Sequence, residues 1–176
     1  SYLEDQDQWW MAGLHREVFV EARSPIGIED IRIDSGIDVD TVRSGTASGH
    51  LNVQVRIAKD SKGQPPKGFQ VRWHLEDASG QQIGDARVCA VASDTSAYVF
   101  AGITATDSWS PGRMNLWSAE TPNLYRVIVT LVDASGHDLE TVCVRTGFRS
   151  VEVQDRSLLI NGKRVIIRGV NRHDHS

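Results

Sequence analysis

The residue types best suited to chemistry lie near the two ends of the sequence. Residues 4–7 read Glu-Asp-Gln-Asp and are followed by Trp9 and Trp10. In an extended chain Asp5 and Asp7 project to the same side. Carboxylates beside aromatic rings suit a sugar, because the rings cover its C–H face while the carboxylates accept from its hydroxyls. Carboxylate oxygens also suit a hard cation. A solvated acidic turn before a strand is the simpler alternative.

The second polar cluster is His173-Asp174-His175. If this segment is a strand, His173 and His175 share a face and could bind a metal ion, although no third ligand is evident. The cluster could instead lie at the rim of an active site or in an exposed loop. The residues alone leave these three interpretations open.

Composition excludes several functional classes. The 176 residues include 19 Lys and Arg against 23 Asp and Glu, a formal charge of −4. A nucleic-acid binder or a protein of anionic membranes would need a clustered basic face, so we expect neither partner. No apolar run approaches the ~20 residues that cross a bilayer. The nucleotide-binding, serine-hydrolase and zinc-protease motifs are also missing from this sequence.

The ends and the cysteines carry two further expectations. The chain starts without Met or a basic-then-apolar leader, and it stops just after an apolar stretch. We therefore expect no signal peptide and a chain cut from a longer polypeptide.

Cys89 and Cys143 are too few for a disulfide framework. We expect two reduced, buried thiols and a cytoplasmic location.

Apolar residues recur with a period of two, which indicates strands. The clearest are residues 50–58 and 69–76, each with one apolar face, and residues 125–133, which are apolar on both faces and should form a central strand. The central aromatic residues are expected to pack in the core and against turns: Trp73, Trp109, Trp117 and Tyr125. Weaker strand candidates are residues 15–22, 28–33, 83–91, 96–104 and 138–148.

Turn residues separate these strands, at 61–66, 77–82, 110–113 and 133–138. No window has a sustained helical period, so we expect almost no helix. About seven strands before Phe148 predict an all-β fold, an immunoglobulin-like antiparallel β-sandwich with flanking extended segments. A small barrel is the alternative that periodicity cannot separate.

The pattern changes after Phe148. Two short runs are joined by Asn161-Gly162, a strong signal for a type I′ hairpin. The second run, residues 164–170, is apolar and leads into polar residues. A parallel barrel strand opens onto an active-site face in this way. We therefore expect a second domain to begin here.

Three segments together resemble the bacterial β-galactosidases of glycoside hydrolase family two. They read SYLEDQDQWWMAGLHREV, LWSAETPNLYRVIVTLVDASG and TGFRSVEVQDRSLLINGKRVIIRGVNRHDH, in that order along almost the whole chain. Residues 34–112 match only by strand pattern. One departure is Leu14-His15-Arg16, where relatives commonly have an apolar-aromatic-Arg run.

The resemblance implies a domain division and a reaction. Residues 1–24 would be the tail of a jelly-roll domain, residues 25–150 the sandwich, and residues 151–176 the hairpin and first strand of a TIM barrel. The reaction would be retaining hydrolysis of terminal β-galactosides such as lactose. Because the two catalytic glutamates of the family lie late in the barrel, this chain would carry no catalytic residue and would be an inactive spacer by itself.

Two substrate-binding residues carry over by resemblance. Asp7 matches the aspartate that contacts the galactose 6-hydroxyl and ligates sodium. His173 matches the histidine that binds galactosyl hydroxyls, with Asn171 and Arg172 as scaffold. Magnesium ligands would lie mostly elsewhere. A homo-oligomer is expected, but residues 92–112 lack the acidic, Gly-rich loop that would reach a neighbouring active site.

Two rival functions follow from the same residues. A β-glucuronidase or β-mannosidase of the same family would share the architecture, although a glucuronidase would need a basic group for the substrate carboxylate. A non-catalytic carbohydrate-binding sandwich would instead bind a glycan by itself.

Overall fold

Strands make up most of the part of the chain that the computed structural model describes, residues 14, 17–58, 67–94 and 102–171. The chain divides into two units, Ser24–Val165 and, separately, Ser1–Arg23 with Ile166–Ser176. Within the described residues no helix is long and apolar enough to cross a membrane. Within these described residues the strands are β1 (Ile28–Ile37), β2 (Thr46–Ile57), β3 (Gln70–Glu76), β4 (Gln82–Ala90), β5 (Ala92–Asp94), β6 (Gly102–Asn115), β7 (Tyr125–Val132), β8 (Asp138–Thr146), β9 (Val151–Gln154), β10 (Ser157–Ile160) and β11 (Lys163–Arg164). A short 3₁₀ helix, η1 (Val39–Thr41), follows β1.

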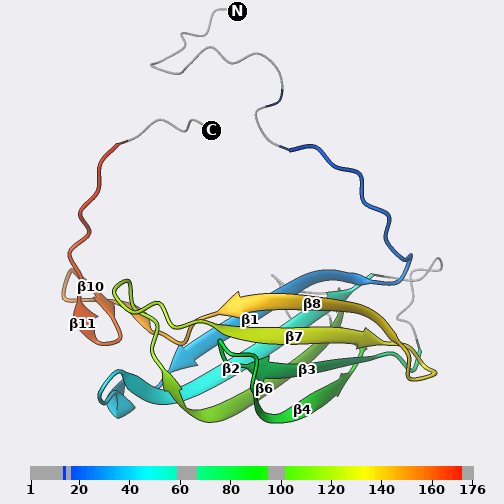
Figure 1. The fold of residues 1–176 in the computed structure, drawn as a ribbon, viewed down its shortest axis with the longest axis horizontal. Helices are drawn as coiled ribbons and strands as arrows, with labels where there is room; N and C mark the ends of the chain where they lie inside the picture. Colours follow the sequence, from blue (N-terminus) through cyan, green and yellow to red (C-terminus); the bar gives the residue numbers. More distant parts are fainter. Residues whose placement is uncertain (1–13, 15–16, 59–66, 95–101, 172–176) are drawn as a thin grey trace, which may run out of the picture. The chain divides into compact units, whose positions relative to one another are not determined.

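Strands β1 to β8 form two antiparallel sheets (Figure 1). One sheet has the order β1-β2-β6-β5 and the other β4-β3-β7-β8. This is the immunoglobulin arrangement, in which strands A, B, E and D face strands C, F and G, here with one further strand beside C. Two separate sheets exclude the small barrel, and the predicted all-β sandwich is confirmed.

A single core fills the space between the sheets. The alternating residues of β2, from Leu51 to Ile57, are at most 1% exposed. Trp73 on β3 is fully buried, and its ring meets that of Trp109 edge to face at 6.0 Å. Strand β7 pairs with β3 on one side and β8 on the other, as its two apolar faces predicted.

The turns predicted at residues 77–82 and 133–138 are confirmed, and both use the sequence Asp-Ala-Ser-Gly. In each, the Asp Oδ1 accepts from two backbone N–H groups further along the turn. The donors are Ser79 (2.8 Å) and Gln81 (3.0 Å) to Asp77, and Ser135 (2.7 Å) and His137 (2.9 Å) to Asp133. The pKa of Asp77 is lowered first by the hydrogen bond from the Ser79 hydroxyl and then by the backbone bonds, and the pKa of Asp133 is lowered first by the bond from the His137 N–H. Gly at φ near 90° completes each turn, in a region that costs other residues strain.

The turn predicted at residues 110–113 is wrong, because β6 runs through it. Leu51 pairs with Trp109 and Gly49 with Gly112, so Ser110 and Pro111 lie opposite His50 alone. This is a β-bulge, which tolerates a proline and bends the strand. Turn residues are typical of bulges too, and the sequence pattern cannot distinguish the two.

Two other strand predictions are wrong within the described residues. Residues 17–22 of the predicted strand 15–22 form no strand, and of residues 164–170 only Arg164 belongs to one, in β11. Residues 17–22 and 166–170 pair with no neighbouring strand among the described residues, and a strand exists only through such pairing. Their large apolar side chains are exposed: Val18, Phe19, Val20, Ile166, Ile167 and Val170. The strand predicted at residues 96–104 lies largely outside the described residues.

Both cysteines are free thiols, as predicted, but only one is sheltered. Cys89 on β4 is partly buried, whereas Cys143 on β8 is exposed, so the expectation that both are buried is wrong. Strands β4 and β8 are the two edges of one sheet. Three strand spacings separate them by about 14 Å, beyond the reach of a disulfide.

The predicted hairpin is confirmed and extended. Strands β9, β10 and β11 form a small antiparallel sheet of their own. Asn161 and Gly162 join β10 to β11 with φ of 53° and 74°, the two positive angles of a type I′ turn. Asp155 and Arg156 make a second such turn between β9 and β10.

Candidate functional site

The residues predicted to bind substrate lie outside the described residues. These are Asp7 with its neighbours Asp5, Trp9 and Trp10, and His173 with His175. Among the residues that are described, no group of three or more His, Cys, Asp or Glu could hold a metal ion.

The motif segments of the sequence converge at one place, here named the sandwich–hairpin junction: residues 116–123, 147–150 and 160–165. The backbone N–H of Trp117 donates to the Phe148 oxygen at 2.9 Å. Gly147 lies against the base of the Trp117 side chain, where an added Cβ would come within 2.9 Å of the Trp117 Cβ, Cγ and Cδ1. Arg149 stacks on the Trp117 ring at 4.4 Å from its centroid. The Thr-Gly-Phe-Arg motif thus packs against Trp117 and hydrogen-bonds to its backbone.

Asn161 connects the hairpin to Trp117 and to the segment that follows the Thr-Gly-Phe-Arg motif. Its side-chain Nδ2 donates to the Trp117 backbone oxygen at 2.9 Å, and its Oδ1 accepts from the Ser150 N–H at 3.0 Å. Its own N–H donates to the Ser150 oxygen at 3.1 Å. The residue is only 8% exposed, and a buried amide needs hydrogen-bond partners. Here both ends of the amide have one. One side chain therefore joins all three parts of the junction.

Internal hydrogen bonds order the loop 116–123 itself. Asn123 Nδ2 donates to the Leu116 oxygen at 2.8 Å. Ser118 and Thr121 exchange bonds, from the Thr121 N–H to Ser118 Oγ at 3.1 Å and from the Ser118 N–H to the Thr121 oxygen at 3.0 Å. The Trp-Ser-Ala-Glu-Thr-Pro-Asn run is therefore a preformed loop.

A cleft of about 480 Å³ lies between this loop and the hairpin. Leu116, Ile160 and Val165 contribute apolar surface to it, while Glu120 and Lys163 add opposite charges. Polar side chains also line the cleft, but those of Ser118, Asn123 and Asn161 are engaged in hydrogen bonds within the junction.

An ion pair joins the two sheets. Arg87 on β4 donates through Nε and a terminal nitrogen to both carboxylate oxygens of Asp107 on β6. The hydrogen bond from Arg87 lowers the pKa of Asp107, and the same bond raises the pKa of Arg87. This bidentate pair bridges the sheets beside the Trp73–Trp109 contact.

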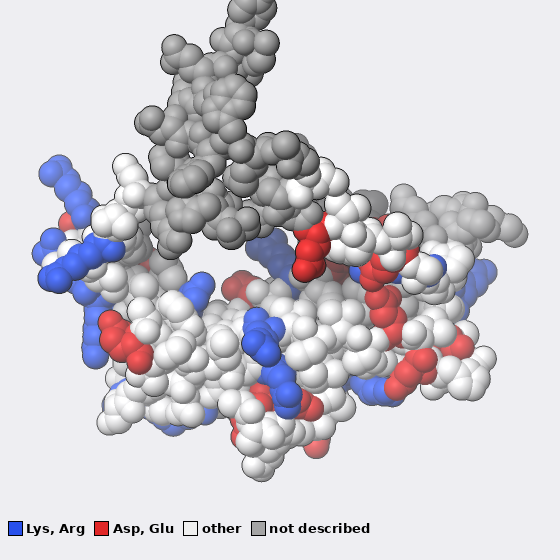
Figure 2. Space-filling model, turned by 45° about the horizontal axis from the view of Figure 1, so that its top comes forward, with Lys and Arg blue, Asp and Glu red and all other residues white. Residues whose placement is uncertain are grey.

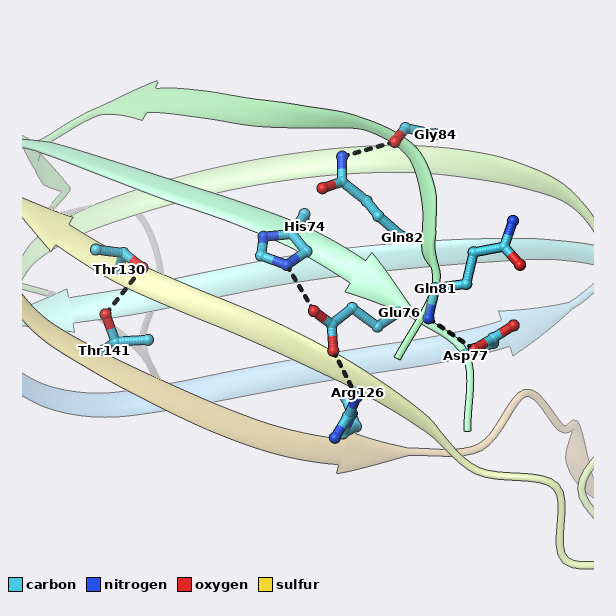
Figure 3. Close-up of polar contacts among 9 residues, drawn as sticks. All are labelled: His74, Glu76, Asp77, Gln81, Gln82, Gly84, Arg126, Thr130 and Thr141. Atoms are coloured by element: carbon cyan, nitrogen blue, oxygen red, sulfur yellow. Dashed lines mark hydrogen bonds and ion pairs between the residues drawn. The ribbon is translucent and has the colours of Figure 1, made fainter. Parts of the chain in front are cut away.

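Polar side chains also line the outer face of the second sheet (Figure 3). One carboxylate oxygen of Glu76 lies 3.1 Å from His74 Nε2, and the other lies 2.9 Å from a terminal nitrogen of Arg126. Thr130 and Thr141 hydrogen-bond across β7 and β8 at 3.1 Å. Acidic and basic side chains are interspersed over the face seen in Figure 2. The Glu76–Arg126 and Thr130–Thr141 contacts each join neighbouring strands, whereas His74 and Glu76 lie on the same strand, β3.

Sequence reasoning missed the junction. It used Asn161 only as a turn residue, and it placed Trp117 among packing aromatics. The signal available was the joint occurrence of the Leu-Trp-Ser, Gly-Phe-Arg and Asn-Gly-Lys runs, whose contact no periodicity predicts.

The fold defines an immunoglobulin-like β-sandwich with a hairpin fixed to its end. The model of the glycosyl hydrolases family 2 matches residues 28–149, and that of the family's TIM barrel domain matches residues 151–176. The chain belongs to glycosyl hydrolase family 2.

Curated relatives carry the name β-galactosidase. The one from Photobacterium profundum is 36% identical over 179 residues, covering 99% of this chain and 16% of the relative. The one from Vibrio vulnificus strain CMCP6 is 34% identical with the same coverage. The chain thus spans about a sixth of the length of these relatives.

Similar solved structures carry the name β-glucuronidase. The enzyme of Bifidobacterium dentium has a TM-score of 0.65 and 22% identity, covering 80% of this chain and 21% of that one. That of Parabacteroides merdae has a TM-score of 0.60 and 20% identity, covering 85% and 17%. At this identity the likeness shows the fold alone.

Proposed function

We propose that this chain is one section of a retaining β-galactosidase that hydrolyses terminal β-galactosides such as lactose. The observation that carries the proposal is the 36% identity to a β-galactosidase over 99% of the chain. The alternative is a β-glucuronidase, the printed name of the similar solved structures. Asp7 favours the galactosidase, because a glucuronidase would place its substrate carboxylate against a basic group rather than an acid.

The reaction uses two carboxyl groups about 5–5.5 Å apart, one as nucleophile and one as acid and then base. We assign both to the part of the enzyme beyond this chain. Asp7 accepts from the galactose 6-hydroxyl, and sugars without that hydroxyl leave a buried carboxylate unpaired. His173 grips a ring hydroxyl more tightly as the ring flattens, which is differential binding of the transition state.

Metal ions have a smaller part in the proposal. Sodium would be held by Asp7, where a carboxylate oxygen suits a hard cation. Magnesium would bind outside this chain. No step is assigned to either ion.

The sandwich itself acts as a spacer. Residues 25–150 would join a jelly-roll tail, residues 1–24, to a barrel that begins at residues 151–176. Rigid elements hold a site more precisely than loops do, and the core and the junction supply that rigidity. The catalytic unit would be a cytoplasmic homo-oligomer.

Parallel assays of the intact enzyme test the proposal. Nitrophenyl β-galactoside, β-glucuronide and β-mannoside are compared by kcat/KM at equal enzyme concentration. We expect the galactoside to be the best substrate by about 100-fold or more, since the site reads individual hydroxyl groups. A higher kcat/KM on the glucuronide would refute the choice of substrate.

A further inference from the structure

Asn161 and Gly162 form a reactive pair as well as a turn. Asn161 is the one asparagine of the sequence that a glycine follows. In such a pair the backbone nitrogen of the glycine can attack the side-chain Cγ of the asparagine, because no side chain obstructs its approach. The new C–N bond closes a succinimide ring, and Nδ2 leaves as ammonia with the proton of the attacking nitrogen. Water then opens the ring at either carbonyl, which gives aspartate or isoaspartate.

The native bonds of Asn161 oppose this reaction. Its Nδ2 donates to the Trp117 oxygen at 2.9 Å, and its Oδ1 accepts from the Ser150 N–H at 3.0 Å. Turning Cγ toward the Gly162 nitrogen would break at least one of these bonds, because they hold the amide from two sides. The residue is also only 8% exposed, which limits access for the water that relays protons between the reacting groups. The amide is therefore protected while the junction is closed.

Opening of the hairpin alone would remove this protection. Strands β9 and β10 have 4 residues each, and β11 has 2. All of β9 is exposed and all of β10 is only partly buried, so little core packing opposes opening. Local opening costs less free energy than global unfolding where few apolar contacts are buried. Modification of Asn161 should therefore proceed through an open hairpin on an otherwise folded sandwich.

The product of the reaction would keep the hairpin from closing as before. At position 161 aspartate has an acceptor oxygen where asparagine has its Nδ2 donor. That oxygen would face the Trp117 oxygen, and a buried carboxylate without a donor is costly. Isoaspartate instead adds a backbone methylene to the turn, which disturbs the pairing of Ile160 with Lys163. Either product therefore weakens the junction permanently.

We propose that Asn161-Gly162 is a deamidation site under the control of the junction. The closed junction protects the amide, local opening exposes it, and the product prevents full reclosure. The reaction needs only water, and it converts a transient opening into a permanent change. The proposal rests on residues of the unit Ser24–Val165 alone and is independent of the proposed function.

Asn123 provides an internal control for the chemistry. It lies in the same junction, and its Nδ2 likewise donates to a backbone oxygen, that of Leu116, at 2.8 Å. Leu124 follows it, however, and a side chain at that position hinders the attacking nitrogen. Asn123 should therefore stay largely unmodified under conditions that convert Asn161, even after unfolding.

Peptide mapping by mass spectrometry measures the modification, since replacing the amide by a carboxyl group adds about 1 Da. The 176-residue chain is incubated at mildly alkaline pH in buffer and in guanidinium chloride. We expect Asn161 to convert about tenfold or more slowly in buffer, because only the open fraction reacts. Equal rates in buffer and in denaturant would overturn the protection by the junction. An Asn161 that converts no faster than Asn123 in denaturant would overturn the site itself.

Two glycine variants test control by the junction. The Cβ of Gly147→Ala would come within 2.9 Å of Trp117 carbons and displace that residue, whereas nothing lies within 4 Å of the Cβ of Gly169→Ala. We expect Gly147→Ala to raise the conversion rate of Asn161 in buffer by about threefold or more and to leave the rate in denaturant unchanged. Equal rates in buffer for the two variants would overturn this control.

Asn161→Asp reproduces one of the products. Hydrogen exchange of the residue-161 amide should become about tenfold or more faster near neutral pH, because its bond to the Ser150 oxygen opens more often. The matched control is Asp155→Asn, the reverse change at an exposed turn residue of the same hairpin. Exchange at residue 161 in this control should stay within about twofold of the unaltered chain. Unchanged exchange in Asn161→Asp would overturn the effect assigned to the product.

Discussion

The hydroxyl of Tyr125 accepts a hydrogen bond at 3.0 Å from the backbone N–H of Asn115, ten residues earlier in the chain. Asn115 ends β6 in one sheet and Tyr125 begins β7 in the other. This is the tyrosine corner of immunoglobulin-like sandwiches. The Tyr125 ring is 6% exposed and meets Phe148 edge to face at 5.3 Å, so the corner adjoins the junction.

Tyr125→Phe should remove this bond and leave the Asn115 N–H without its acceptor. The expected loss in free energy of unfolding is about 1–2 kcal/mol, the value of one hydrogen bond plus an unsatisfied group. Urea denaturation followed by fluorescence measures it. An unchanged midpoint would mean that water replaces the hydroxyl and that the corner adds no stability.

Gly147→Ala should destabilise the junction. Its Cβ would meet Trp117 carbons at 2.8–2.9 Å, so the indole or the backbone must move. Overpacking of this kind costs about 1–3 kcal/mol. Gly169→Ala is the matched control, because nothing lies within 4 Å of its added Cβ. Equal unfolding free energies for the two variants would contradict the packing argument.

Low pH should weaken the ion pair between Arg87 and Asp107, which joins the two sheets. The pKa of Asp107 is lowered by the Arg87 hydrogen bond, so its contribution to stability is present above the unfolded value of about 4 and is lost as pH falls through the folded value. The gap in unfolding free energy between the unaltered chain and Asp107→Asn should therefore be widest near neutral pH and narrow below about pH 4.

Asp138→Asn provides the comparison for that experiment. Asp138 pairs with Arg72 on the outer face, where both side chains are about half exposed. Its removal near neutral pH should cost about 0.5 kcal/mol or less. A larger loss for Asp138→Asn than for Asp107→Asn would contradict the ranking by burial.

The two thiols should react at different rates. Burial raises the pKa of Cys89 to about 11, and its Sγ donates to the Val71 oxygen at 3.5 Å. Cys143 is exposed on an edge strand. Because the thiolate is the reactive form, an aromatic disulfide reagent at mildly alkaline pH should label Cys143 quickly and Cys89 slowly. Rapid labelling in a Cys143→Ser variant would contradict the shelter assigned to Cys89.

The sandwich could be predicted from the sequence, because a strand with one face in the core must alternate apolar and polar residues. Strands β2, β3 and β7 lie where Leu51, Trp73 and Val129 indicated, since each strand must turn those side chains inward. The error at Ser110–Gly112 has the same origin, because Pro and Gly fit a bulge as well as a turn. Cys143 is exposed because alternate residues of β8 face opposite sides of the sheet and its position faces outward. The residue type alone does not predict this.

The junction could not be predicted from local patterns. The partners Trp117 and Asn161 are 44 residues apart and meet only when the sandwich is complete. Asp7 and His173 stay predictions of the family resemblance, because they lie outside the described residues. The identity of the family came from long ordered motifs, whereas the contacts that explain those motifs came from the fold.

Selectivity for the 6-hydroxyl of the sugar tests the central claim most directly. The measurement compares kcat/KM of the intact enzyme on nitrophenyl β-galactoside and on its 6-deoxy analogue, for the unaltered protein and Asp7→Asn. If Asp7 reads that hydroxyl, the unaltered enzyme should prefer the galactoside by about 100-fold or more, and the variant should lose most of this preference. An equal preference in both proteins would contradict the account.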